Sequence, residues 1–169
     1  MPNWSPDDRT ELDRMLAAAA EKKTAGLDAL RAEAASASPS HERTAALVQL
    51  YCADHAAVGH SWDRAAHTFV IRLAADHPGT SGEVVDLGGA EALVAHSRHT
   101  QAEIDLVLNE LRLRRWHPDA RTYAYGFGYD AVADVVDVET NAPPEVVAPL
   151  LARYPTALAV RHGRATGRG

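Results

Sequence analysis

The stretch RTYAYGFGYDAVADVVDV, residues 121–138, decides the fold that we expect for this chain. In its first half aromatic residues alternate with small ones, so that one side of an extended strand carries Tyr123, Tyr125, Phe127 and Tyr129. Its second half is rich in valine, which favours a strand. The pattern predicts a β-hairpin, in which two antiparallel strands are joined by a short turn.

The number of residues in the hairpin turn decides which side chains lie beside the aromatic ones, because a shift by one residue exchanges the two faces. With an even number, Tyr125 and Phe127 share a face with Val136 and Val138. With an odd number, they share a face with the neighbouring acidic residues, as in a site for a cationic ligand or partner. We favour the even number because it makes one face wholly apolar.

The residues on either side of the hairpin predict four further elements. Residues 92–97 indicate a strand, and Thr100 and Glu103 form a capping box that opens a helix. Pro143 precedes a second helix, and residues 156–160 indicate a last strand. The order βαββαβ is typical of a ferredoxin-like arrangement, an antiparallel sheet with both helices on one face. The other face then needs cover from the N-terminal helices or a second subunit.

Helical spacing of apolar residues predicts three helices before this region. Ser5 caps the first, which runs to the turn before Pro39, and the second begins there and ends at Gly59. The third begins after Ser61, although residues 67–73 also fit a strand.

We therefore expect an α+β protein in which an N-terminal three-helix layer precedes a ferredoxin-like sheet with two helices. Glycine and proline mark the boundary between the two parts. The expected divisions are a helical region at 1–77, a Gly-rich linker at 78–90, a βαββαβ domain at 91–162 and a disordered tail at 163–169.

Composition and charge exclude several classes of function. The chain has 169 residues, of which 46% are hydrophobic, as in soluble globular proteins. Its net charge of -6 argues against nucleic-acid binding, and no apolar run approaches the ~20 residues that span a membrane. The N-terminus lacks the features of a secretory signal. We expect a cytoplasmic protein, or an extracellular one if a signal was removed.

Few residues are candidates for chemistry. Cys52 is the only cysteine, so no disulfide forms within the chain. If the second and third helices form a hairpin, Cys52, His55 and His67 come level and could ligate a metal. We favour the alternative, a buried thiol and surface imidazoles, with no metal and no cofactor. No catalytic motif is evident, so the catalytic residues are unassigned and we lean towards a protein that is not an enzyme.

Two functions fit these observations. The first is a module that binds a protein partner or a second copy, as a homodimer, through the aromatic hairpin face, because an uncovered aromatic patch is seldom left bare. The second is a small-molecule-binding protein or small enzyme with a pocket between the helical layer and the sheet. The expected binding residues are Tyr123, Tyr125, Phe127, Tyr129, His96, His99 and Asp137.

The hairpin also resembles a known family. GFGYD at 126–130, followed by DVVDV at 134–138, is similar to a hairpin in the C-terminal part of the propeptide of α-lytic-type, streptogrisin-like serine proteases secreted by actinobacteria. RHTQAE at 98–103 is similar to the strand-to-helix step upstream of such hairpins. The resemblance covers residues 92–162 and implies a βαββαβ module that folds against, or binds, another protein.

Overall fold

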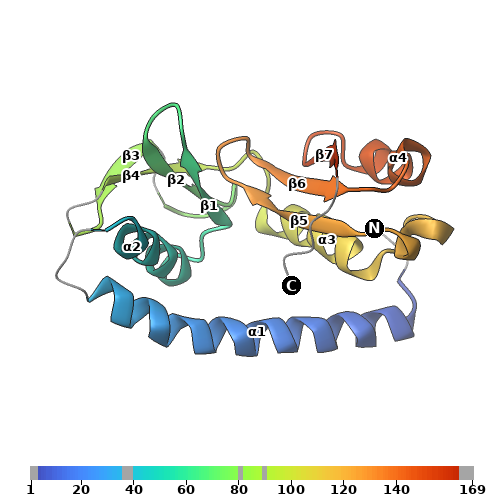
Figure 1. The fold of residues 1–169 in the computed structure, drawn as a ribbon, viewed down its shortest axis with the longest axis horizontal. Helices are drawn as coiled ribbons and strands as arrows, with labels where there is room; N and C mark the ends of the chain where they lie inside the picture. The colour runs from blue at the N-terminus through green and yellow to red at the C-terminus, as the bar shows by residue number, and fades with distance from the viewer. Residues whose placement is uncertain (1–3, 36–39, 80–81, 89–90, 164–169) are drawn as a thin grey trace.

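The structure is a computed structural model that describes residues 4–35, 40–79, 82–88 and 91–163. Within these residues the chain forms four α-helices, one short 3-10 helix and seven strands, which divide between two sheets (Figure 1). The expected α+β class is confirmed. None of the helices in the described part of the chain combines the length and the apolar character that crossing a membrane requires.

The longest element, α1 (Pro6–Ala34), lies beneath both sheets along the long axis of the molecule (Figure 1). Ser5 caps it: Ser5 Oγ accepts a hydrogen bond from Asp8 N, and the Asp8 carboxylate accepts one from Ser5 N. Asp8 also forms an ion pair with Arg115, with 2.7 Å between Oδ1 and Nε. Because an Ala-rich helix is only marginally stable alone, such contacts hold α1 against the rest of the chain.

The first sheet packs against α2 and has the strand order β1-β2-β4-β3. Its hairpin, β1 and β2, is antiparallel, and β4 runs parallel to β2. Between this sheet and α2, Val48 of the helix and Ile71 and Val94 of the strands are buried in one hydrophobic cluster. The elements are α2 (His41–Asp54), β1 (Gly59–Asp63), β2 (Thr68–Leu73), β3 (Glu83–Asp86) and β4 (Glu91–His96).

The second sheet has the order β5-β6-β7 and carries α3 and α4 on one face. Its hairpin, β5 and β6, is antiparallel, and β7 runs parallel to β6. Val107 of α3, Val136 of β6 and Leu150 of α4 are buried in one cluster. The elements are α3 (Gln101–Leu113), η1 (Pro118–Thr122), β5 (Tyr125–Asp130), β6 (Val135–Thr140), α4 (Pro144–Arg153) and β7 (Leu158–His162).

The two sheets repeat one unit, a helix followed by a hairpin and by a third strand parallel to the second strand of the hairpin. We call α2 with β1, β2 and β4 the first unit, and α3 with β5, β6 and β7 the second unit. Their hairpins have the same register, since Gly59 pairs with Arg72 as Gly126 pairs with Glu139.

Each hairpin ends in a four-residue turn with the same internal hydrogen bonds. In the first turn, residues 64–67, the Asp63 carboxylate accepts hydrogen bonds from two turn amides at 2.8 and 3.1 Å. In the second turn, residues 131–134, Asp130 does the same at 2.9 and 3.2 Å. The last turn residue has a left-handed backbone in both, with φ of 51° at His67 and 60° at Asp134.

The expected third helix is wrong, because the chain forms the β1–β2 hairpin after Ala57. Most residues of Thr68–Leu73 are buried, those facing α2 and also Val70 on the opposite face. An apolar run of this kind satisfies helical and strand spacing alike, so periodicity alone does not separate the two.

The ferredoxin-like sheet is also wrong, although the βαββαβ order is present from β4 to β7. β4 pairs with β2 and β3 instead of the C-terminal strands, because long-range pairing, which chain order does not fix, decides the sheet that a strand joins. Residues 83–86 of the expected linker at 78–90 form β3, a strand of the first sheet. Residues 80–81 and 89–90 of it, and 164–169 of the expected tail, lie outside the described residues.

Candidate functional site

The hairpin of the second unit has the even-numbered turn that we favoured. Tyr125 pairs with Thr140 and Phe127 pairs with Val138, so these four side chains share a face. Tyr125 is only 9% exposed, in the cluster that α3 and α4 complete, and burial raises the pKa of its hydroxyl. Tyr123 and Phe127 are half-buried against the same cluster. The chain's own helices therefore cover the aromatic face.

Tyr129, the last aromatic residue of the series, reaches the first unit. A Cβ added to Gly59 would lie 2.9 Å from Tyr129 Cδ1, so the ring occupies the space beside this glycine. The Tyr129 hydroxyl donates a hydrogen bond to the Asp134 carboxylate. Burial, and then this contact with Asp134, raise the pKa of Tyr129. The ring therefore links the two hairpins.

Asp134, at the end of the second turn, joins the two units. Its carboxylate accepts hydrogen bonds from Ser97 Oγ at 2.6 Å, from Arg98 N at 2.8 Å and from Arg98 Nε at 3.0 Å. Burial alone would raise the pKa of Asp134, but the hydrogen bonds from Ser97, Tyr129 and Arg98 outweigh it and lower this pKa to about 2. The carboxylate is therefore ionised at neutral pH, where it binds the end of β4 to the second hairpin.

We call these contacts between the two units the joint. Arg72 of the first sheet also takes part in it. Its Nε donates a hydrogen bond to Ala131 O at 2.7 Å, and Ala131 N donates one to Ser61 Oγ at 3.0 Å. The second turn therefore docks on the face of the first sheet opposite α2. Ser97 donates to a carboxylate and not to an imidazole, so the joint lacks the geometry of an activated nucleophile.

The other three predicted binding residues lie apart from one another. His96 is the last residue of β4. His99 is buried, with its Nε2 3.2 Å from Thr156 O. Asp137 lies on the opposite face of the second sheet from the aromatic residues and pairs with Arg161. The structure does not assemble these residues into one site.

The three residues considered for a metal are also separated. Cys52 lies near His60, with 3.8 Å between Sγ and Nδ1. The His55 ring stacks on Tyr51, and His67 lies in the first turn, at the far end of the hairpin. In the described ranges no group of three or more His, Cys, Asp or Glu side chains is placed to hold a metal ion.

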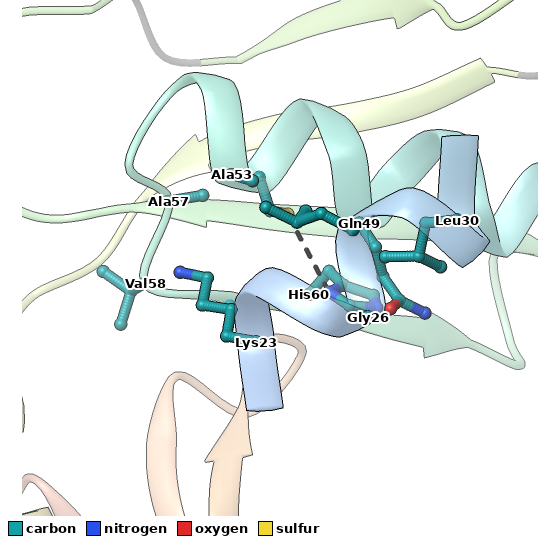
Figure 2. A pocket seen from close by; sticks show the side chains of 11 residues that line it. Lys23, Gly26, Leu30, Gln49, Ala53, Ala57, Val58 and His60 are labelled. Atoms are coloured by element: carbon teal, nitrogen blue, oxygen red, sulfur yellow. Dashed lines mark hydrogen bonds between the residues drawn. The ribbon is translucent and has the colours of Figure 1, made fainter. Parts of the chain in front are cut away.

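A hollow of about 320 Å³ opens between α1, α2 and β1 (Figure 2). Lys23, Gln49, Cys52 and His60 supply its polar groups, and the rest of the lining is glycine and apolar side chains. Burial raises the pKa of the Cys52 thiol to about 12 and lowers the pKa of His60. At neutral pH this pair is a thiol and a neutral imidazole, so the hollow holds no activated nucleophile.

Among the described residues, nothing covers the face of the second unit's sheet that is opposite α3 and α4. We call this the uncovered face; the residues on it are Gly126, Gly128, Asp130, Val135, Asp137, Glu139, Ala159 and Arg161. A Cβ added to Gly126 or Gly128 would meet no described atom within 4 Å. The equivalent face of the first unit, in contrast, is occupied by Tyr129 and the second turn.

Acidic residues predominate on the uncovered face. Arg161 Nε donates a hydrogen bond to Asp137 at 2.9 Å, and this bond, together with the charges of Asp137, Glu139 and Asp130, raises the pKa of Arg161. The Arg161 side chain is still 71% exposed. With three carboxylates around one guanidinium, the face favours a cationic partner.

Sequence reasoning missed the joint, although it placed Ser97 and Arg98 at the end of a strand. The available signal was the internal repeat, DRAAH at 63–67 and DAVAD at 130–134, in which the first Asp and the fourth-position Ala coincide. Aligning the two turns would have marked Asp134 as the residue that replaces His67.

Comparisons with known proteins give no relative: no protein-family model, no curated protein and no solved structure matches the chain. The fold and the site alone define the class, an α+β chain of two like units with one sheet face uncovered among the described residues.

Proposed function

We propose that the chain is a non-enzymatic protein-interaction module that binds a partner on its uncovered face. The glycines of β5 are the observation that carries this proposal. Glycine weakens the interior of a strand and is typical of places where another group comes close. Gly59 has such a neighbour in Tyr129, whereas within the described residues Gly126 and Gly128 have none. Their space is free for a group from outside.

The charge of the uncovered face indicates the kind of partner. Asp130, Asp137 and Glu139 outnumber Arg161, the one cation among the described residues of the face, and the whole chain has a net charge of -6. A partner surface with basic side chains would be attracted to this face and held in register by it.

This contact surface is on the opposite side of the hairpin from the aromatic face considered first. Tyr125 is buried and Phe127 half-buried, so their role is to hold the hairpin on α3 and α4. The resemblance of residues 126–138 to a protease propeptide hairpin supports the same class of function, since it implies a module that folds against another protein.

Site-specific photo-cross-linking tests the proposal. A photoreactive phenylalanine analogue in place of Gly128 adds a reporter at a position where a Cβ would meet no described atom within 4 Å. Irradiation in extracts of cells that make the protein should give a covalent adduct with a protein. Glu139→Lys should lower the yield of this adduct about tenfold, because it reverses a charge of the face.

The matched control carries the same analogue in place of Lys22, which is exposed on α1. Equal adducts at positions 22 and 128, or none at position 128, would show that the uncovered face binds no protein.

A second candidate function is the binding of a small molecule in the hollow between α1, α2 and β1. Lys23 provides a positive charge, and Leu27, Leu30 and Val58 provide apolar surface, which together suit a small anion with an apolar body. The hollow is lined by residues 23–60 alone, so it is not the pocket that we expected between the helical region and the sheet at 91–162. Its lining does not include the residues that we predicted for that pocket, Tyr125, Tyr129, His96, His99 and Asp137.

The fluorescent anion 1-anilinonaphthalene-8-sulfonate is a suitable probe of this hollow. Ala53→Trp fills the hollow and should abolish the fluorescence increase, whereas Ala18→Trp, on the exposed surface of α1, should leave it unchanged. Equal fluorescence from the two variants would exclude binding in the hollow.

A further inference from the structure

The joint between the two units shows how the end of one hairpin docks on the sheet face of another unit. Three contacts define this docking. The Tyr129 ring covers Gly59, the backbone of Ala131 is bound by Ser61 and Arg72, and the Asp134 carboxylate is bound at the end of β4. As a result Ala131 is fully buried and Asp134 is 4% exposed.

The chain also has the two surfaces that a second docking of this kind needs, the end of the first hairpin and the uncovered face. Among the described residues, nothing from the same chain docks on either surface. All four residues of the first turn, 64–67, are exposed. Trp62, which takes the place of Tyr129, is one of the few large apolar side chains that remain exposed, at 40%. Gly126, which takes the place of Gly59, faces open space. A hairpin end and a sheet face of matching design are therefore both free.

The charges of the two free surfaces are complementary. Arg64 takes the place of Ala131, and Glu139 takes the place of Arg72. In the existing joint the Arg72 guanidinium of the face donates a hydrogen bond to the backbone carbonyl of Ala131 in the turn. In the second docking the Arg64 guanidinium of the turn would meet the Glu139 carboxylate of the face, and these opposite charges attract.

His67 extends this complementarity. It takes the place of Asp134 and shares its left-handed backbone. Gly163 takes the place that Ser97 has in the existing joint. A Cβ added to Gly163 would lie 3.2 Å from Glu139 Oε1. An imidazole N–H of His67 docked in this way would find a carboxylate acceptor.

We propose that the first turn of one copy docks on the uncovered face of a second copy, with Trp62 over Gly126 and Arg64 beside Glu139. This inference rests on the proposed function and names the partner as the chain itself. The contact is head-to-tail, because it joins two different surfaces, so it builds a closed ring where the rotation between copies closes and an open filament where it does not.

The intermolecular contact is weaker than the existing joint, because covalent linkage gives joined units an effective concentration in the millimolar range. Sedimentation velocity should therefore be measured from micromolar concentrations up to about 1 mM. The expected result is a weight-average sedimentation coefficient that rises with concentration and falls when salt is added.

Gly126→Leu adds a side chain whose Cβ would meet no described atom within 4 Å, so it should block the face and weaken association at least about tenfold. The matched control is Gly26→Leu, which also adds a side chain where nothing lies within 4 Å but on α1, away from the face. This control should associate like the unchanged chain.

A charge exchange tests the partners of the contact directly. Arg64→Glu and Glu139→Arg should each remain monomeric when studied alone, because like charges then face one another. An equimolar mixture should regain association, since each variant then meets an opposite charge at both of its surfaces. Circular dichroism of each variant verifies that it is folded.

A chain that stays monomeric at about 1 mM overturns this inference, as do charge variants that associate alone as the unchanged chain does. The proposed function has a separate readout. If the reporter at position 128 cross-links a different protein while the chain is monomeric, the face binds protein but the partner is not a second copy. If the reporter forms no adduct with any protein, both the proposed function and the self-association are contradicted.

Discussion

The two units have the same hairpin register and the same turn, yet the face of the first is covered and the face of the second is open. Gly59 touches a tyrosine ring, whereas Gly126, at the same place in the second hairpin, faces open space. The residue that ends each turn differs in the same way. Asp134 binds the other unit, and its counterpart His67 is exposed. A repeated fold therefore does not produce repeated surfaces.

The largest expected difference concerns these two turn residues. Asp134→Gly keeps the left-handed backbone but deprives Ser97, Tyr129 and Arg98 of their acceptor, so we expect a loss of about 3 kcal/mol in the free energy of unfolding. His67→Gly removes an exposed side chain and should change stability by less than about 0.5 kcal/mol. Urea denaturation of both variants measures the contrast. Equal losses would mean that the joint does not stabilise the fold.

Acid should remove the same interaction in the unchanged chain. The pKa of Asp134 is lowered from 3.8 to about 2 in the folded state, so the folded state binds the proton less tightly than the unfolded state does. The resulting stability is complete above 3.8 and is lost as the pH falls through about 2, a loss of about 2 kcal/mol. Denaturation at several pH values checks this. Asp134→Gly should lack this part of the acid sensitivity, and an unaltered pH profile in that variant would contradict the assignment.

The next largest effect on stability is expected at the two equivalent glycines, Gly59 and Gly126. At Gly59 a new Cβ would lie 2.9 Å from the Tyr129 ring, so Gly59→Val should cost about 1–3 kcal/mol of stability. At Gly126 the same change meets no described atom within 4 Å and should be neutral or slightly stabilising, because valine suits a strand better than glycine. Thermal unfolding of the two variants compares them. A destabilised Gly126→Val would show that its face is not open.

The smallest effect is expected on the uncovered face itself. Arg161 pairs with Asp137, but its side chain is 71% exposed, so Arg161→Ala should leave the free energy of unfolding almost unchanged. The same variant makes the face more acidic and should strengthen the binding of a basic partner. A loss of several kcal/mol would mean that this face supports the fold and is not reserved for binding.

Local sequence signals predicted the elements well where each signal lies within one element. Ser5 caps α1, and Thr100 and Glu103 form the capping box of α3. The predicted hairpin is present with the even-numbered turn that we favoured, although its first strand begins at Tyr125, after a 3-10 helix at Pro118–Thr122. The third helix failed because its apolar residues are buried on both faces of a sheet, a pattern that fits a helix equally well.

The candidate site was harder to predict, because its parts are far apart in the sequence. Cys52 was considered with His55 and His67, but the strand that replaced the predicted helix brings His60 to it instead. Asp137 and Tyr125 were both named as binding residues, yet alternation along the strands places them on opposite faces.

The sequence by itself determined the caps, the hairpin of the second unit and the side of it that is apolar, because each follows from contacts between residues close in the chain. Only the tertiary structure decided that β4 joins β2, that Asp134 binds Ser97, and that Gly59 is covered while Gly126 is open. These outcomes depend on pairing between segments that are distant in the sequence, and local propensity and periodicity contain no information about which distant segments meet.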